Sequence, residues 1–366
     1  MPHRLVFFPD YRGANPYQSL LYAHSAEELY PEPGSIAEAI AVRRRQAPEE
    51  ATIFHLHWED AVYRNEPDEA SARTAAERFA AELERFVDSG GTVLWTLHNE
   101  IPHDDRFPSV RAALRAVLVR LVDLVHVHGL AGVRFARDEL GIGPERLAVV
   151  PHGNYRPHVA PLRGPRSSSR SALGLPEDAR VLLFFGRLDA YKGGAELLEA
   201  FGRLDRPELW LVVAGKQVVP LDDGLAALPE RVRGRVRVEA GQIPRERIPI
   251  LFHAADALVA PYRRVLTSGA AMLALTLARP VIAPAHPGLG ELVRDGVEGL
   301  LYDPAEPAGL ERAIERFLAL DVEVRRALEV RAEERAGLFD WRMLGNLYRG
   351  LFAMLIAARR PMRRLD

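Results

Sequence analysis

Residues 181–201 read VLLFFGRLDAYKGGAELLEAF, which has the pattern of a buried strand, a short turn and a helix. Five apolar residues stop at Gly186, Arg187 follows at once, and Lys192 precedes two glycines where the helical pattern begins. Such a unit places free backbone N–H groups and the positive helix end at the carboxyl edge of a sheet, where they favour phosphate. Arg187 can donate to two phosphate oxygens, and Lys192 can add a point charge. The stretch therefore predicts a diphosphate-binding turn; a salt-bridging surface turn is the alternative.

Strand-like runs alternate with helical patterns on both sides of this stretch. In the first half the runs begin near residues 4, 51, 92, 124 and 147. The second half contains VLLFF, LWLVVAG, VRVEAG, ALVAPY, PVIAP and GLLYD. Strands that alternate with helices indicate parallel sheets covered on both faces. The chain is therefore predicted to be an α/β protein with two Rossmann-like, doubly wound domains in tandem.

The expected domain boundaries follow from a change in composition. Residues 156–174 are rich in Pro, Ser and Arg and show no periodicity, which is typical of a linker. We expect an N-terminal domain at 1–158, a linker at 159–172 and a C-terminal domain at 173–340. Residues 341–366 are expected to form a helix and a basic tail that packs back on the N-terminal domain. Because ligands bind at the carboxyl ends of such strands, the site is expected in a cleft between the domains.

Composition excludes several classes of protein. The formal net charge of -2 argues against general nucleic-acid binding, which needs a basic surplus. The absence of cysteine excludes disulfides and cysteine-ligated metals. Neither a signal peptide nor an apolar stretch of membrane-spanning length is recognisable. These features predict a cytoplasmic protein.

The segment FFGRLDAYKGGAELLEAF resembles the G-R-L-x-x-x-K-G segment of GT-B glycosyltransferases, especially those of family 4. The resemblance continues through LWLVVAGKQ, AGQIPRERIPILFHAADALVAPY and the late segment ARPVIAPAHPGLGELVRDGVEGLLYDP. In the first half, TLHNEIPHD and VVPHGNY match the N-terminal domain and the entry to the hinge.

The resemblance implies transfer of a sugar from a UDP- or GDP-sugar, which is a co-substrate, without a further cofactor or a metal. Arg187 and Lys192 would hold the donor diphosphate and neutralise it as it departs. His98, which follows a strand, would contact the donor sugar and stabilise the reacting centre. The nucleotide base would be recognised by backbone groups around Gly241, Gln242 and Ile243.

One departure from the family concerns its Glu-x7-Glu motif. The two positions fall on Val265 and Leu273, so both carboxylates are missing. The first would bind a sugar hydroxyl and the second the ribose. The loop offers Thr267, Ser268 and Gly269 instead, as a second anion cradle at a helix start or an ordinary helix cap. Glu291 is a further candidate for the ribose contact.

The acceptor side is expected in the first half. The loop at residues 11–17 takes the place of the family's acceptor loop, and the expected contacts are Arg12, Gly13, Asn15 and Tyr17. An inverting reaction needs a base, for which Glu59, Asp60 and Asp10 are the candidates. The pair His55 and His57 could suggest a metal, but we expect the two side chains to point to opposite faces of their strand, so no metal site is predicted.

Two basic stretches raise the question of peripheral membrane contact. Arg111, Arg115 and Arg120 lie along one apolar helical pattern. The C-terminal tail joins an apolar run to Arg359, Arg360, Arg363 and Arg364. Basic amphipathic helices can rest on anionic lipid at the inner face of a membrane, although such a helix more often simply packs on a Rossmann sheet.

The sequence thus predicts a metal-independent glycosyltransferase that acts with retention on a glycan, lipid-linked or small-molecule acceptor. One alternative is an inverting enzyme of the same fold, such as a GDP-mannose beta-mannosyltransferase. The other is a homologue that binds sugar nucleotides without transferring them, which the missing glutamates would explain.

Overall fold

The computed structural model describes residues 3–24, 28–102 and 105–358. The chain divides into two compact units. Unit 1 comprises Met1–Gly153 and Trp341–Asp366, and unit 2 comprises Asn154–Asp340. The expected linker at 159–172 needs correction, because part of it forms helix α6 (Arg166–Ser171) within unit 2, packed against α10 (Arg247–Ala254).

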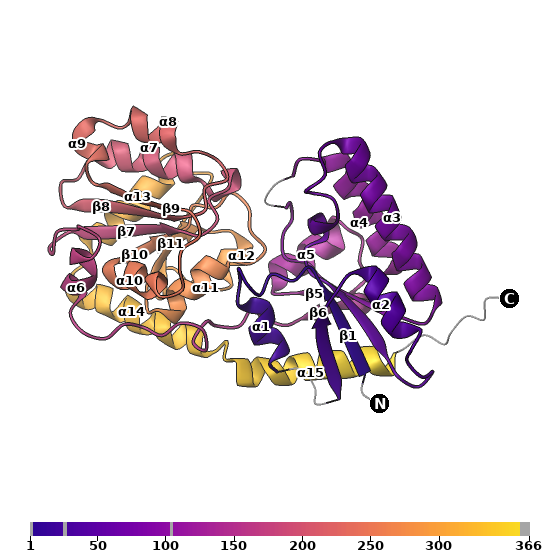
Figure 1. Ribbon diagram of the computed structural model, residues 1–366. Helices are drawn as coiled ribbons and strands as arrows, with labels where there is room; N and C mark the ends of the chain where they lie inside the picture. Colours follow the sequence, from indigo (N-terminus) through magenta and orange to yellow (C-terminus); the bar gives the residue numbers. More distant parts are fainter. Residues whose placement is uncertain (1–2, 25–27, 103–104, 359–366) are drawn as a thin grey trace. The chain divides into compact units, whose positions relative to one another are not determined.

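Unit 1 contains a six-stranded parallel sheet with the order β2-β1-β3-β4-β5-β6 (Figure 1). The strands are β1 (His3–Phe8), β2 (Leu29–Pro33), β3 (Thr52–Leu56), β4 (Thr92–Thr96), β5 (Leu124–Val127) and β6 (Leu147–Val149). The five predicted strands are confirmed. The sequence did not predict β2, whose LYPEP contains two prolines. Proline cannot donate to a ladder and is tolerated at an edge, which is where β2 lies.

The helices of unit 1 are α1 (Tyr17–Tyr22), α2 (Ile36–Arg43), α3 (Glu69–Asp88), α4 (Pro108–Leu121), α5 (Leu130–Asp138) and α15 (Trp341–Ala357). Short 3-10 turns lie at Glu59–Val62 and Pro144–Arg146. Helices α2, α3 and α4 pack side by side, and α15 packs against α1 (Figure 1). Helix α3 begins where Asp68 accepts from the N–H of Ser71, and it buries Phe79, Leu83 and Phe86.

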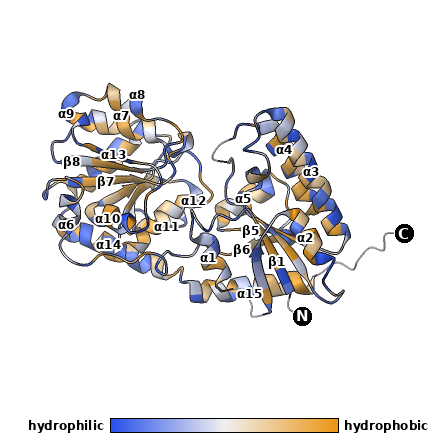
Figure 2. Ribbon diagram, viewed as in Figure 1, coloured by the Kyte–Doolittle hydropathy of each residue, from blue (hydrophilic) through white to orange (hydrophobic). Residues whose placement is uncertain are grey.

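Unit 2 contains a second six-stranded parallel sheet, with the order β12-β11-β10-β7-β8-β9. Its strands are β7 (Arg180–Phe185), β8 (Leu209–Gly215), β9 (Val236–Ala240), β10 (Ala257–Val259), β11 (Val281–Pro284) and β12 (Gly299–Tyr302). All six predicted strands are confirmed. Figure 2 shows hydrophobic colouring along the central strands, as expected for strands buried on both faces.

Helices cover both faces of the second sheet (Figure 1). On one side lie α7 (Gly194–Leu204), α8 (Asp222–Ala227), α9 (Glu230–Arg233) and α13 (Gly309–Ala319). On the other lie α6, α10, α11 (Gly269–Thr276) and α14 (Val322–Gly337). A 3-10 turn at Ala190–Lys192 precedes α7, and α12 (Pro287–Gly290) follows β11. This doubly wound arrangement confirms the predicted fold class.

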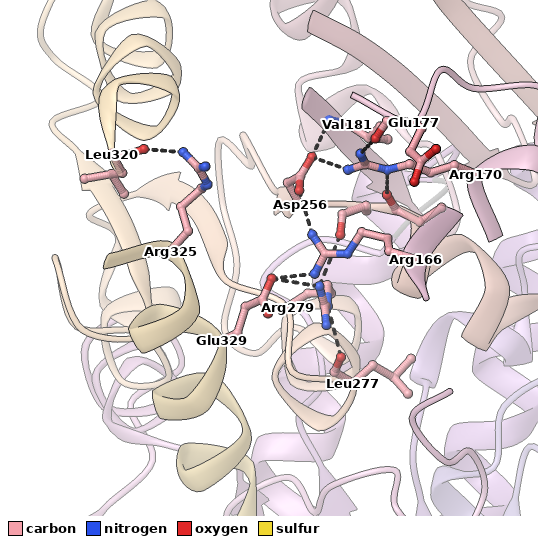
Figure 3. Close-up of polar contacts among 12 residues, drawn as sticks. Arg166, Arg170, Glu177, Val181, Asp256, Leu277, Arg279, Leu320, Arg325 and Glu329 are labelled. Atoms are coloured by element: carbon pink, nitrogen blue, oxygen red, sulfur yellow. Dashed lines mark hydrogen bonds and ion pairs between the residues drawn. The ribbon is translucent and has the colours of Figure 1, made fainter. Parts of the chain in front are cut away.

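A network of ion pairs stabilises the amino-terminal edge of the second sheet (Figure 3). Asp256, just before β10, accepts from Arg166 at 2.6 Å, from Arg170 at 2.8 Å and from the N–H of Val181 at 2.7 Å. Arg166 also pairs with Glu329 of α14 at 2.6 Å. The network joins α6 to β7, β10 and α14, which is why the Ser- and Arg-rich segment is not a linker. Ligands of parallel sheets bind at the opposite edge, so we assign the network a structural role.

The arginines of α4 are used inside unit 1. Arg115 is buried and pairs with Glu59, Arg111 pairs with Asp105 at 2.9 Å, and Arg120 pairs with Glu84. These pairs favour the alternative that α4 packs on the sheet, and contact of this helix with a membrane stays a prediction. The four arginines of the tail lie outside the described residues. In the part of the chain that the structure describes, no helix is long and apolar enough to cross a membrane.

Candidate active site

The turn between β7 and α7 depends on glycine. Gly186 ends the strand with φ +112° and Gly193 precedes the helix with φ +72°, values that L side chains rarely adopt. A Cβ on Gly193 would lie 2.2 Å from the carbonyl oxygen of Pro261. The two glycines therefore allow the chain to turn back sharply, which brings Lys192 over the end of β7.

Lys192 is a buried cation at the carboxyl edge of the second sheet. Its side chain is almost fully buried, and its Nζ would lie 3.5 Å from a Cβ placed on Gly186. The ammonium also sits 5.1 Å from the centroid of the Tyr262 ring. Among the described residues, its Nζ has no hydrogen bond or ion pair. Burial lowers the pKa of Lys192 to about 8. A desolvated ammonium that makes no direct ion pair with a protein carboxylate, although the charge of Asp189 acts on it, is suited to an incoming anion.

Arg187 is partly engaged within the same turn. Its Nε donates to Oδ1 of Asp189 at 3.2 Å, and the arginine side chain is about one-third exposed. The buried Asp189 thus orients the guanidinium. The planar group has five N–H donors, so this contact leaves donors for a ligand oxygen. The alternative of a salt-bridging turn describes Arg187 in part but does not describe Lys192.

Three neighbouring strands end in glycines with positive φ. Gly186 (+112°), Gly215 (+143°) and Gly241 (+106°) lie at the ends of β7, β8 and β9. A Cβ on Gly215 would lie 1.8 Å from the carbonyl oxygen of Gly186, and the N–H of Gly241 donates to Gly215 at 3.0 Å. The structure places exposed Gln242 and half-buried Ile243 directly after this row. The edge therefore presents backbone rather than side chains, as the predicted base region requires.

The start of α11 is capped by a serine. Ser268 Oγ accepts from the N–H of Ala271 at 3.1 Å and also bonds to the Tyr262 side chain. The cap interpretation therefore holds for Ser268, and its hydroxyl is largely committed. Thr267 and Gly269 on either side are half-buried.

The two positions of the missing carboxylates lie around this helix. Leu273 is buried within α11, and Val265 is half-buried in the loop before it. Glu291 is half-buried at the end of α12, where its backbone carbonyl accepts from Arg335 at 2.6 Å. Its role at the ribose stays a prediction.

In unit 1, polar side chains occur two positions apart on three neighbouring strands: His55 and His57, Thr96 and His98, and His126 and His128. Residues at this spacing share a face of the sheet, so the three pairs form one cluster at the carboxyl ends of β3, β4 and β5. The expectation that the first pair would point to opposite faces is wrong. Both histidines bond to the Tyr22 hydroxyl, and their ring centroids lie 4.0 Å apart.

Of this cluster, the sequence suggested a functional role only for His98, and the pair His55 and His57 was set aside. The signal for the rest was the repeated spacing in HLH, TLH and HVH, each at a strand end. The members are buried and hydrogen-bonded to one another or to backbone carbonyls. Within the described residues, no group of three His, Asp or Glu side chains is placed to hold a metal.

The loop at residues 11–17 contributes to the cluster through its last residue. Tyr17 is the first residue of α1 and is buried, with its ring 5.4 Å from the rings of both His98 and His128. Tyr17 thus begins a helix rather than ending a loop, and its contact with an acceptor stays a prediction. Asn15 accepts from the N–H of Tyr17 at 3.0 Å and shapes the turn, whereas Gly13 is exposed.

Glu59 orients the loop that follows His98. Its carboxylate binds Nε of buried Arg115 at 2.7 Å, and the same guanidinium donates to the carbonyls of Asn99 at 3.1 Å and Glu100 at 2.5 Å. Removing one partner of a buried pair leaves the other charge uncompensated. The role of Glu59 as a free base is therefore corrected to that of a structural ligand for Arg115.

The other two candidate bases are also paired. Asp60 binds Arg64 at 3.2 Å, and Asp10 binds Arg12 through both of its oxygens at 2.8 Å. The Arg12 side chain lowers the pKa of Asp10, which weakens Asp10 as a base. None of the three predicted carboxylates is thus available without breaking an ion pair.

The buried histidines make a pH-dependent contribution to stability. Burial lowers the pKa of His126 and His152 to about 4 and the pKa values of His55 and His57 well below 6.5. The unfolded chain therefore binds more protons than the folded chain between these values, so stability falls with falling pH. We expect the melting temperature to change little around pH 7 and to drop from about pH 6.5 downward.

The pH range of this loss of stability distinguishes the histidines from the carboxyl groups. Carboxyl groups with lowered pKa values lose their contribution only below about pH 4.5, the ordinary value for Glu. Melting curves at closely spaced pH values between 7 and 5 test this account. A melting temperature that does not change over that interval would contradict it.

The match to a known protein family falls within unit 2. Residues 165–335, most of unit 2, match the family model of glycosyl transferases group 1. A GDP-mannose:glycolipid 4-beta-D-mannosyltransferase of Xanthomonas campestris pv. campestris is 27% identical over 272 residues, covering 74% of this chain and 70% of the relative. The protein is a glycosyltransferase with the GT-B fold.

One further relative and one solved structure extend the comparison. A D-inositol 3-phosphate glycosyltransferase of Geodermatophilus obscurus is 34% identical over 223 residues, which cover 56% of this chain and 46% of the relative. The crystal structure of Anabaena HepE in complex with UDP-glucose matches with a TM-score of 0.70 at 17% identity, covering 96% of this glycosyltransferase and 99% of that chain. This structural likeness shows the fold.

Proposed function

We propose that the glycosyltransferase transfers mannose from GDP-mannose to a lipid-linked acceptor, with inversion at the anomeric carbon. The observation that carries a nucleoside diphosphate donor is the buried ammonium of Lys192 at the end of β7. The choice of donor sugar and acceptor is supported by the Xanthomonas relative, whose name specifies GDP-mannose, a glycolipid and a beta-mannoside.

In the proposed reaction, an acceptor hydroxyl oxygen forms a bond to C1 of mannose while the bond from C1 to the diphosphate oxygen breaks. GDP leaves with the bonding electron pair, and the acceptor proton passes to a base. Lys192 and Arg187 stabilise the negative charge that develops on the diphosphate. This electrostatic contribution comes from the two cationic side chains of the turn after β7.

The ion pairs of unit 1 limit the choice of the base. Because Glu59, Asp60 and Asp10 are each paired with an arginine, we assign the role of base to His98. A histidine needs no counter-ion in its neutral form. Inversion with His98 as the base replaces the sequence-based expectation of retention as our proposal.

The anomeric configuration of the product tests this proposal. Transfer from GDP-mannose to a lipid-linked oligosaccharide should yield a beta-mannoside, identified by NMR of the product. An alpha-mannoside would establish retention. Absence of transfer and of donor hydrolysis across a panel of acceptors would favour the homologue that only binds sugar nucleotides.

Thermal-shift measurements should identify the nucleotide. GDP at a hundred times its dissociation constant should add about 2.7 kcal/mol to the free energy of unfolding, and UDP at the same concentration should add less. An equal or larger shift with UDP would contradict the assignment of the base without affecting the diphosphate site.

The apolar residues at the Glu-x7-Glu positions predict weak selection at the ribose. Buried Leu273 cannot accept a hydrogen bond from a ribose hydroxyl, and strong rejection of an analogue requires a polar group that the analogue leaves unpaired. We expect 2′-deoxy-GDP to bind within about three-fold of GDP, a difference below about 1 kcal/mol. Calorimetric titration measures both constants.

A ten-fold or larger penalty for the deoxy analogue would show that another residue has taken over the contact. Glu291→Gln then identifies it: loss of the penalty in this variant would assign the ribose contact to Glu291.

A further inference from the structure

A continuous chain of hydrogen bonds links a backbone carbonyl to His98 through unit 1. His126 Nε2 lies 3.0 Å from the carbonyl oxygen of Val150, and its Nδ1 lies 2.9 Å from Thr96 Oγ1. Thr96 Oγ1 lies 2.7 Å from His55 Nε2, and His55 Nδ1 lies 2.8 Å from the Tyr22 hydroxyl. The chain thus crosses from β5 over β4 to β3.

The last links connect Tyr22 to the candidate base. The Tyr22 hydroxyl lies 2.7 Å from His57 Nε2, and His57 Nδ1 lies 3.1 Å from His98 Nε2. Burial keeps the pKa values of His55, His57 and His126 low and that of the Tyr22 hydroxyl high. These four side chains are therefore neutral at pH 7, and each has one donor and at least one acceptor.

The carbonyl of Val150 gives this chain a direction. A carbonyl oxygen can only accept, so His126 carries its proton on Nε2 and accepts at Nδ1 from the Thr96 hydroxyl. Thr96 then accepts from Nε2–H of His55, and Nδ1 of His55 accepts from the Tyr22 hydroxyl. Tyr22 in turn accepts from Nε2–H of His57.

The same logic reaches His98. Because His57 is protonated on Nε2, its Nδ1 accepts, and the donor to it is Nε2–H of His98. Neutral His98 therefore has its lone pair on Nδ1. A reversed chain would set the lone pair of His126 Nε2 against the carbonyl oxygen of Val150, and an unmade buried hydrogen bond is costly.

We propose that Tyr22, His55, His57, Thr96 and His126 are positioning residues that hold His98 as the Nε2–H tautomer, so that Nδ1 is the atom that accepts a substrate proton. This rests on the proposed function for the role of His98, whereas the tautomer itself does not. In general a histidine ring is oriented by the bond that its other nitrogen makes. Here the hydrogen bond from His98 Nε2 to His57 has its direction determined by the Val150 carbonyl, with five hydrogen-bonding side chains in between.

Two other histidines give the prediction an internal contrast. His128 Nδ1 lies 3.1 Å from the same Val150 carbonyl, and His152 Nδ1 lies 2.8 Å from the carbonyl of Gly153. Both must donate from Nδ1 and are therefore Nδ1–H tautomers. The five histidines of the cluster and His152 thus comprise four Nε2–H and two Nδ1–H rings. An intrinsic preference for one tautomer cannot produce this pattern.

Nitrogen-15 NMR of the full-length protein labelled at histidine tests the tautomers without substrate. Signals are assigned by their loss in single His→Gln variants at pH 7. We expect His55, His57, His98 and His126 to be protonated on Nε2, and His128 and His152 on Nδ1. Protonation of His98 or His57 on Nδ1 would overturn the proposal.

Variants at Thr96 test the coupling. Thr96→Val removes the hydroxyl that joins His126 to His55 and fixes the direction of the hydrogen bonds, whereas Thr96→Ser retains it. In Thr96→Val we expect the ratio of the two His98 tautomers to shift by about ten-fold or more, as loss of a buried hydrogen bond implies. We also expect kcat to fall with the donor KM unchanged, and Thr96→Ser to restore both. An unchanged tautomer ratio in Thr96→Val would overturn the proposal.

A second pair of variants controls for nonspecific effects of substitution on folding. Tyr22→Phe interrupts the chain between His55 and His57 and should act like Thr96→Val. Tyr348→Phe is the matched control, because its hydroxyl lies 3.5 Å from His126 Nε2, outside the chain, and it should change neither tautomers nor kcat. Equal effects of the two substitutions would refute a specific relay. A shifted His98 tautomer ratio with unchanged transfer in Tyr22→Phe would refute the catalytic part while leaving the diphosphate site intact.

Discussion

Replacement of His98 by alanine should lower kcat by about 10²- to 10⁴-fold, the range that general acid–base catalysis contributes. The nucleoside diphosphate should still bind with nearly unchanged affinity, because the residues assigned to it belong to unit 2. Steady-state kinetics with GDP-mannose and titration with GDP measure the two effects separately.

His98→Gln is the matched variant for this experiment. Its amide can still donate to His57 Nδ1, so the packing of the cluster is retained, but an amide does not act as a base. We expect its kcat to be as low as that of His98→Ala. Equal losses of kcat and GDP affinity in both variants would mean that His98 has a structural role.

Replacement of Lys192 by alanine should weaken GDP binding by about ten- to a hundred-fold, since a hydrogen bond to a charged group contributes roughly 1.5–3 kcal/mol. Arg187→Ala should act in the same direction. Lys216→Ala is the control: Lys216 is the only other lysine in the chain, follows a strand in the same sheet and is exposed. An unchanged titration curve in Lys192→Ala would refute the diphosphate site.

The pKa of Lys192 adds a pH dependence to this prediction. Because burial lowers it to about 8, the free protein loses the positive charge as the pH rises above that value. Binding of GDP then requires uptake of a proton, so affinity should fall above about pH 8 in the wild type. The same titration with Lys192→Ala should lack this step.

The fold was predictable because its signals are local. Eleven strands follow from apolar runs in alternation with helical patterns, and only β2 was missed, because its prolines conceal an edge strand. The turn after β7 was also readable, since Arg187, Lys192 and the glycines lie within eight residues of one another.

What the sequence could not supply were the partners of charged side chains. Glu59 looks like an available base until its contact with Arg115, 56 positions away, is known. The Ser- and Arg-rich segment resembles a linker until Arg166 and Arg170 are seen to bind Asp256. The histidine cluster was missed for a different reason: its spacing of two was assigned to the wrong faces of the strand.

Acceptor-dependent release of GDP from GDP-mannose tests the central claim most directly. The wild-type protein, supplied with a lipid-linked oligosaccharide acceptor, should release GDP in step with formation of a beta-mannoside, and Lys192→Ala should do so far more slowly at the same donor concentration. Equal rates of release by Lys192→Ala and the wild type, or no acceptor-dependent release from either GDP-mannose or UDP-glucose, would contradict the account.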